Sequence, residues 1–214
     1  ADGEPKPLTW VAGLDLAQIE DPQKAAEGDG DYFALAVIGI DTEGEQAYLD
    51  FLARERGLTT KQAKDWVVRH IEGRTPTSPG YTLSELLVEQ NAGRGVGQRL
   101  AEDTHIPARN VNSSGSKEQR IHNLAGDFED RELLIHGDPK RDPWRTFEQS
   151  EWLPFPTGAH DDLLDAIELA ARAVSFGHGT ATARMGGDDR PSDGDDLDSI
   201  VQEQVQRRTN PWKS

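Results

Sequence analysis

Three apolar runs near the N-terminus alternate with polar segments. They cover Leu8–Ala17, Tyr32–Ile40 and Gln46–Leu52, and the turn-forming sequence Asp41-Thr-Glu-Gly44 separates the second run from the third. Runs of this length with turn residues between them are typical of β-strands. Consecutive strands with short connections pair as an antiparallel meander. The pattern therefore predicts a three-stranded antiparallel unit at the start of the fold.

The hydrophobic period changes after these strands. From Thr59 to Glu72, apolar residues recur at intervals of three and four, and Gly73 supplies a stop signal, which predicts an amphipathic helix. Strand and helix patterns then alternate, which indicates βα units. The further expected strands are Leu83–Val88, Ile106–Val111 and Glu132–Ile135, and the further expected helices are one through Glu102, one opened by the capping box Ser116-Lys-Glu-Gln119, Trp144–Ser150 and His160–Phe176.

The same pattern divides the chain into three parts. Residues 1–7 are polar with two prolines and are predicted to be a linker, residues 8–177 carry all the expected elements, and residues 178–214 are rich in Gly, Asp, Ser and Arg. A segment with so few apolar residues cannot offset the entropy of ordering. We therefore expect one α/β domain whose element order begins βββαβαβα, followed by an acidic, disordered tail.

Composition excludes several kinds of chemistry. The chain contains no cysteine, so disulfides, thiolate zinc sites, iron–sulfur clusters and cysteine nucleophiles are excluded. A metal would have to be held by oxygen or imidazole. No apolar run reaches 18 residues, and no basic segment leads into an apolar one near the start. We therefore expect neither a membrane span nor a signal peptide.

Carboxylates mark three places along the chain. Asp15 lies within the first expected strand, where burying a charge is costly without a counter-charge or metal. Glu89 ends the fourth expected strand. Asp165 shares a helix face with Asp161 and Asp162, being three and four residues away. A salt-bridged aspartate, a solvated strand end and the ordinary preference for acids at a helix start are the structural alternatives. A carboxylate cluster with a function would suit Mg²⁺ or Mn²⁺.

Taken in order, these segments resemble the ribonuclease H-like nuclease fold, and within it the C-terminal nuclease domain of the large terminase subunits of tailed viruses. The likeness extends over about residues 8–176. The matching pieces are Gly13-Leu-Asp15-Leu-Ala, Asp31-Tyr-Phe-Ala-Leu-Ala-Val, Val88-Glu89-Gln-Asn, Lys117-Glu-Gln-Arg120-Ile and Glu151-Trp-Leu-Pro-Phe-Pro-Thr-Gly-Ala-His160-Asp161-Asp162-Leu-Leu-Asp165-Ala. The resemblance implies a mixed sheet, with an antiparallel meander plus parallel strands, flanked by helices.

The resemblance also implies a function. It implies a two-metal endonuclease, using Mg²⁺ or Mn²⁺, that cleaves double-stranded viral DNA concatemers in the cytoplasm of an infected host. Matched by motif, the metal ligands would be Asp15, Glu89, Asp161 and Asp162, with Asp165 a third helix ligand or a support. His160 would orient water or simply precede the helix.

Four basic residues are candidate DNA contacts. Lys117 and Arg120 begin a helix after a loop, where they could meet phosphate, and Arg94 and Arg99 surround the glycine-rich segment. The alternative interpretation of Lys117 and Arg120 is a solvated helix start.

The chain departs from the family in one respect, the ATPase motor. Large terminases carry an ATPase before the nuclease, and Gly93-Arg-Gly-Val-Gly-Gln-Arg99 lacks the lysine and hydroxyl of a phosphate-binding loop. We therefore expect an ATPase domain upstream in a full-length protein, or a stand-alone relative, with the portal, the procapsid and the small terminase subunit as partners. Two rivals stay open: another ribonuclease H-like nuclease, such as a Holliday-junction resolvase, and a non-catalytic acidic module that binds capsid or portal.

Acidic residues dominate the charge. The chain has 39 Asp and Glu against 23 Lys and Arg, a formal net charge of −16, whereas nucleic-acid binders usually show the opposite balance. The body without residues 185–214 is still acidic. One interpretation is an ordinary solvated surface. The other is adaptation to molar salt in a halophilic host, which the excess of Arg over Lys also suits.

The second interpretation makes a prediction about stability. Self-repulsion destabilises an acidic body at low ionic strength, and screening relieves it. On the halophilic hypothesis, the melting temperature rises markedly between about 0.1 M and multimolar KCl, beyond the range of simple Debye screening. Calorimetry or circular dichroism across that range measures it. A flat or falling trend leaves only the solvated-surface interpretation.

Overall fold

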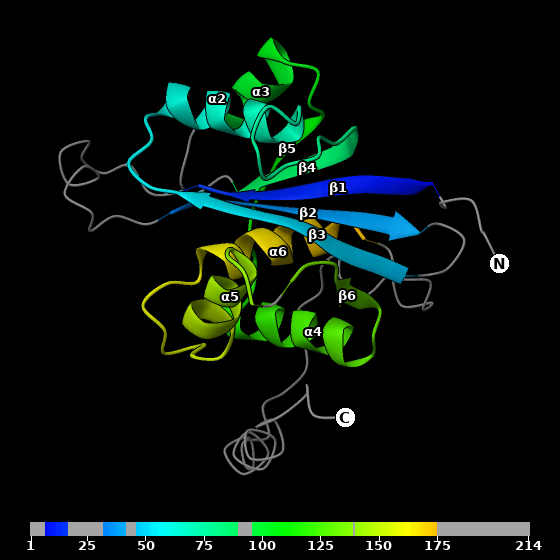
Figure 1. The fold of residues 1–214 in the computed structure, drawn as a ribbon. Coiled ribbons are helices and arrows are strands. Elements are labelled where there is room, and N and C mark those ends of the chain that lie inside the picture. The colour runs from blue at the N-terminus through cyan, green and yellow to red at the C-terminus, as the bar shows by residue number, and fades with distance from the viewer. Residues whose placement is uncertain (1–6, 17–31, 42–45, 90–95, 139, 175–214) are drawn as a thin grey trace, which may run out of the picture. The chain divides into compact units, whose positions relative to one another are not determined.

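The three N-terminal apolar runs form the centre of the sheet (Figure 1). Strands β1 (Leu8–Asp15), β2 (Phe33–Asp41) and β3 (Gln46–Glu55) pair antiparallel in that order. This confirms the predicted meander. The computed structural model describes residues 7–16, 32–41, 46–89, 96–138 and 140–174, so the predictions for the tail, and for all of the linker except Pro7, concern residues outside these ranges.

Three parallel strands complete the sheet within the described residues. Strand β4 (Leu83–Glu89) lies beside β1, β5 (Ala108–Val111) lies beside β4, and β6 (Leu133–Ile135) lies beside β3. The strand order is β5-β4-β1-β2-β3-β6. The expected mixed sheet, antiparallel in its centre and parallel at both sides, is therefore confirmed.

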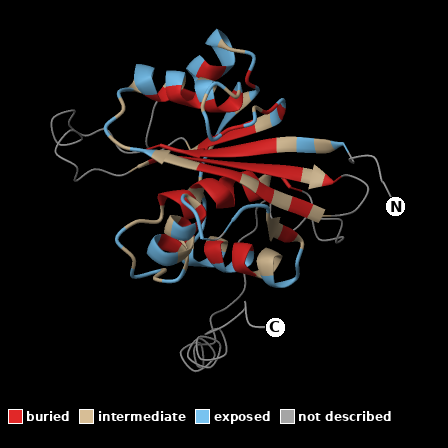
Figure 2. Ribbon diagram, in the orientation of Figure 1, coloured by how far each residue is buried: buried red, intermediate tan, exposed pale blue. Residues whose placement is uncertain are grey.

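Helices cover both faces of the sheet (Figure 1). Helices α2 (Thr60–Ile71) and α3 (Val96–Asp103) lie on one face. The other face carries α4 (Lys117–Glu129), α5 (Trp144–Thr146), the π-helical turn η1 (Phe147–Trp152) and α6 (Asp162–Arg172). The central strands are buried over most of their length (Figure 2). They are apolar on both faces because each face has its own helix layer.

Alternate residues of β1 enter two separate cores. Val11 packs with α6 and the helices on its side, whereas Ala12 and Leu14 pack with α2 and α3. A strand sends successive side chains to opposite faces. Residues 11, 13 and 15 therefore face α6, and this parity decides which way Asp15 points.

The helix starts differ from the prediction in one respect. A full capping box forms at α2, where Thr59 and Gln62 satisfy each other's backbone groups, although the sequence analysis placed the box at α4. At α4, Ser116 accepts a hydrogen bond from the backbone of Gln119, but the Gln119 side chain donates to Asn123 instead of returning to the cap. The expected box at residue 116 is thus half formed.

Helix α6 packs unusually closely against β1. A Cβ atom added to Gly13 would lie 2.1 Å from the carbonyl oxygen of Ala166 and 2.5 Å from the backbone nitrogen of Ala170. Real Cβ atoms do not approach backbone atoms this closely. Only glycine at this position lets the helix axis come down onto the strand.

In the described part of the chain, no helix combines the length and apolarity needed to cross a membrane.

The packing at Gly13 can be tested by adding one methyl group. Gly13→Ala forces α6 away from β1, so we expect the free energy of unfolding to fall by about 3 kcal/mol or more, the upper end of overpacking costs. Urea unfolding followed by circular dichroism measures the change.

Gly126→Ala is the matched control, because a Cβ at this position in α4 meets nothing within 4 Å. It should stabilise the protein by up to about 1 kcal/mol, since alanine is the better helix former. Equal effects of the two substitutions would show that the close approach of α6 to β1 is not required.

Candidate active site

Asp15 ends β1 on the face that α6 covers. Its side chain is buried, with 9% of the residue exposed. Strand β4 runs parallel to β1 with Leu14 opposite Val88, so Glu89 continues the register beside Asp15. The predicted pair of carboxylates therefore lies at neighbouring strand ends.

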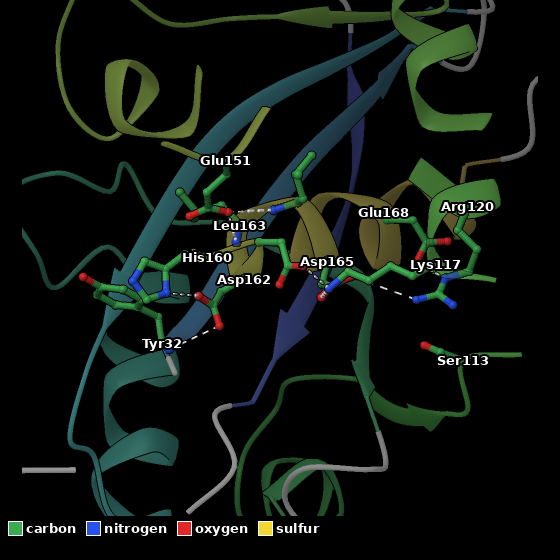
Figure 3. A network of polar contacts seen from close by, with 12 residues as sticks. Tyr32, Ser113, Lys117, Arg120, Glu151, His160, Asp162, Leu163, Asp165 and Glu168 are labelled. Atoms are coloured by element: carbon green, nitrogen blue, oxygen red, sulfur yellow. Dashed lines mark hydrogen bonds and ion pairs between the residues drawn. The ribbon is translucent and has the colours of Figure 1, made fainter. Parts of the chain in front are cut away.

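The start of α6 brings two further carboxylates to this place (Figure 3). Asp162 is the first residue of the helix and is buried. Its Oδ1 atom accepts a hydrogen bond from the backbone N–H of Tyr32 at 3.2 Å, and its Oδ2 atom lies 3.9 Å from Nδ1 of His160. Asp165 follows one turn later and is mostly buried.

The charges of these carboxylates act on one another. Burial raises the pKa of Asp15 well above its ordinary value, and the charges of Asp165, Glu89 and Asp162 raise it further. Burial also raises the pKa of Asp165 to about 6, although Lys117 opposes the rise. Like charges gathered in a desolvated place disfavour ionisation of each member. A cation among them would relieve this cost.

Asp161 and Lys117 form the outer part of the site. Asp161 is less enclosed, with 43% of its side chain exposed, and it forms an ion pair with Lys117 Nζ at 2.7 Å. The same ammonium lies 2.5 Å from Asp165 Oδ2. Burial lowers the pKa of Lys117, but its bonds to Asp161 and Asp165 outweigh that effect and leave the pKa raised.

The other candidate DNA contacts occupy different surroundings. Arg120 Nε lies 3.4 Å from Glu168, and its Nη2 is 4.0 Å from Asp165 Oδ1. Arg99 is exposed on α3, and Arg94 lies outside the described residues. Lys117 and Arg120 are therefore engaged with α6 carboxylates, and DNA contact by any of the four residues stays a prediction.

The sequence analysis missed the role of Glu151, which is fully buried. Its Oε2 atom accepts hydrogen bonds from the backbone of Leu163 at 2.7 Å and Leu164 at 3.2 Å, and its Oε1 atom pairs with Arg54 at 2.9 Å. A carboxylate in this position satisfies free N–H groups at the start of α6 and suits the helix dipole. Burial raises the pKa of Glu151 to about 7, against the opposing effects of those N–H groups and of Arg54.

The need for this contact becomes clear only in the structure. Asp161, at the cap position of α6, makes no side-chain capping bond, so the helix start needs an acceptor from elsewhere. Nothing in the local pattern identifies a glutamate at the end of η1 as that acceptor.

A cationic and aromatic cluster flanks Asp162 on the side away from Lys117. The guanidinium carbons of Arg54 and Arg56 lie 4.2 Å and 3.8 Å from the ring centre of Tyr32. Nη2 of Arg56 is 3.0 Å from Nε2 of His160, whose ring meets Tyr32 edge-on. These contacts hold His160 and the Tyr32 backbone beside Asp162. His160 therefore does more than precede the helix.

The set of candidate metal ligands has the chemistry that a hard divalent cation prefers. All its members are carboxylates, and Asp165 Oδ1 is buried with no hydrogen-bond partner among the described residues. In the described ranges, however, no three acidic or imidazole groups are already as close as a metal cage requires. One of the candidate ligands, Asp165, is paired with Lys117.

The fold matches those of solved nuclease structures. The nuclease of the large terminase from thermophilic phage G20c, solved with zinc, is 18% identical with a TM-score of 0.51 over 80% of this chain and 84% of that one. The human cytomegalovirus terminase nuclease domain, manganese-soaked and inhibitor-bound, is 16% identical with a TM-score of 0.50 over 78% and 83%.

A longer large terminase, from another thermophilic bacteriophage, is 12% identical with a TM-score of 0.52 over 81% of this chain and 42% of that one. The chain has the ribonuclease H-like fold of large-terminase nuclease domains. At these identities the likeness establishes the fold alone. By sequence, no family model and no curated protein matches the chain.

Removal of the Glu151 carboxylate should loosen the start of α6. Glu151→Ala leaves Arg54 without its partner and two helix N–H groups without an acceptor. We expect the free energy of unfolding to fall by about 3 kcal/mol or more, as when one member of a buried ion pair is removed. Urea unfolding measures it.

Glu148→Ala in the same turn, η1, is the control. Its side chain is only partly buried, so the change should stay within about 0.5 kcal/mol. A Glu151 variant as stable as this control would exclude the capping role.

Proposed function

We propose that the chain is a metal-dependent endonuclease that cleaves double-stranded viral DNA concatemers during genome packaging. The observation that carries the proposal is the convergence of Asp15, Glu89, Asp162 and Asp165, from two strand ends and one helix start, in the fold of large-terminase nuclease domains. Burial raises the pKa values of Asp15 and Asp165, and buried carboxylates perturbed in this way are typical of functional sites.

Asp15, Glu89, Asp162 and Asp165 would hold Mg²⁺ or Mn²⁺, in the proposed arrangement two ions that share Asp15. Bound there, such ions activate a water and stabilise the leaving oxygen in phosphodiester cleavage. Two of the comparison structures support a divalent cation, since one was solved with zinc and the other was soaked with manganese. Asp161 is the predicted ligand that fits least directly, because its side chain is more exposed and its charge is not among those that raise the pKa of Asp15.

The surrounding residues would position the ligands. Glu151 fixes the start of α6 by accepting from Leu163 and Leu164, and the Tyr32 N–H restrains the Asp162 carboxylate. A ligand held in this way loses less conformational freedom on binding. Both contacts therefore serve the same end, a preorganised helix start.

DNA would be the negatively charged partner of an acidic protein. The basic candidates Arg94, Arg99, Lys117 and Arg120 stay proposed phosphate contacts, and the location of Arg56 beside His160 adds a fifth. Few phosphate contacts imply a shallow dependence of affinity on salt. The ATPase, portal, procapsid and small terminase subunit are proposed partners on the strength of the resemblance.

Asp15 is the decisive residue for this function. Asp15→Ala should abolish Mn²⁺-dependent cleavage of plasmid DNA and Mn²⁺ binding by calorimetry, since the shared ligand is gone. The variant should stay folded. In EDTA it should melt at a higher temperature than the parent, because one of several repelling carboxylates has been removed.

Asp130→Ala is the control, since it removes an exposed acid at the end of α4, and it should cleave normally. Full cleavage by the Asp15 variant would exclude the proposed site. If the Asp15 variant fails to fold, instead of staying folded and losing only cleavage, a structural ion in a non-catalytic module would be favoured. Cleavage of four-way junctions but not linear or plasmid duplex would indicate a resolvase.

A further inference from the structure

Lys117 is the first residue of α4 and reaches across to α6. Its Nζ atom lies 2.7 Å from Asp161 Oδ2 and 2.5 Å from Asp165 Oδ2. Both distances are those of charge-assisted hydrogen bonds. One third of the Lys117 side chain is exposed, against 13% for Asp165. The ammonium therefore enters the site from its outer rim and bridges an inner and an outer carboxylate.

The neighbouring cations have other partners. Glu168 receives Arg120 Nε at 3.4 Å and Arg172 Nη2 at 2.6 Å, so these guanidiniums are directed along α6, away from its start. Arg120 approaches Asp165 only to 4.0 Å. Of these three cations, Lys117 makes the closest contact with Asp165.

An ammonium in this position supplies positive charge to the carboxylates, as a metal ion would. It donates to Asp165 Oδ2, beside the Oδ1 atom that has no hydrogen-bond partner among the described residues, and its charge opposes the rise in the pKa of Asp15 caused by the other carboxylates. A divalent ion bound by the same carboxylate would lie close to the ammonium and repel it. Asp161, which is more exposed, offers the ammonium a second partner that it can keep when Asp165 is taken.

We propose that Lys117 is an intramolecular counterion that holds Asp165 until a divalent cation displaces it, and that Asp161 then retains the displaced ammonium. This inference rests on the proposed function, which supplies the displacing Mg²⁺ or Mn²⁺. It makes Lys117 a positioning residue, and it makes Asp161 the partner of Lys117 instead of a metal ligand.

The first test removes the ammonium while keeping the length of the side chain. In Lys117→Met, the affinity for Mn²⁺ measured by calorimetry should rise by about tenfold or more, since a competing unit charge at contact distance is lost. In EDTA the melting temperature should fall, because the carboxylates lose their counterion. Both readouts are independent of cleavage.

Arg172→Met is the matched control. It removes one positive charge from α6 but leaves Asp161 and Asp165 with their partner. Its affinity for Mn²⁺ should stay within about threefold of the parent, as expected for a screened, indirect charge. An equal gain in Mn²⁺ affinity in both variants would mean that Lys117 acts only through general electrostatics. It would overturn direct competition between Lys117 and the metal ion for Asp165.

The second test separates the two roles of Asp161 by a double-mutant cycle. Asp161→Asn should weaken Mn²⁺ binding in the parent, because the released ammonium returns to Asp165. In the Lys117→Met background the same substitution should change the affinity by less than about twofold, the behaviour of a residue that acts only through its partner. An undiminished loss in that background would make Asp161 a direct ligand and overturn its proposed role.

The outcomes also separate this inference from the proposed function. If the parent binds Mn²⁺ but Lys117→Met leaves its affinity unchanged and weakens only duplex DNA binding, Lys117 is a phosphate contact and the inference fails alone. If neither the parent nor the variant binds Mn²⁺ or Mg²⁺, both fail together.

Discussion

The contact between Gly13 and α6 is the constraint on which the site depends. Because residue 13 has no side chain, the backbone of α6 comes within the space that a Cβ atom would need. Asp15 follows two residues later on the same face of β1. The start of the helix, with Asp162 and Asp165, is thereby placed over the strand end that carries Asp15. A longer distance between helix and strand would separate the carboxylates that raise the pKa of Asp15.

Gathering carboxylates in a buried place costs free energy, and the surroundings offset it in two ways. Beneath the helix start, Glu151 adds another carboxylate but gives it two N–H donors and Arg54. At the rim, Lys117 neutralises Asp161 and Asp165. The first contact is inaccessible to solvent and keeps the helix in place. The second lies at the rim, as the proposed exchange of Lys117 for a divalent cation requires.

How far the sequence predicts the site can be judged residue by residue. Asp15 was placed within the first strand and Glu89 at the end of the fourth, and the structure has both residues at the ends of the paired strands β1 and β4. Asp162 and Asp165 were placed at the start of a helix, where they lie. Lys117 was assigned to phosphate from its position at a helix start. Its carboxylate partners are 44 and 48 residues away along the chain, a separation that no local pattern spans.

The sequence by itself determined the elements and their order, because hydrophobic periodicity is local: strands alternate every two residues, helices repeat every 3.6, and glycine marks the ends. It also determined which residue types were available for chemistry. Only the tertiary structure decided the partners of each charge. Glu151 caps a helix that begins 11 residues later, Arg54 and Arg56 at the end of β3 meet Tyr32 just before β2, and Lys117 crosses between two helices. Such contacts depend on side-chain direction and on the distance between packed elements. Those of Glu151 and Lys117 also depend on the place of α6, which Gly13 allows to pack closely on β1.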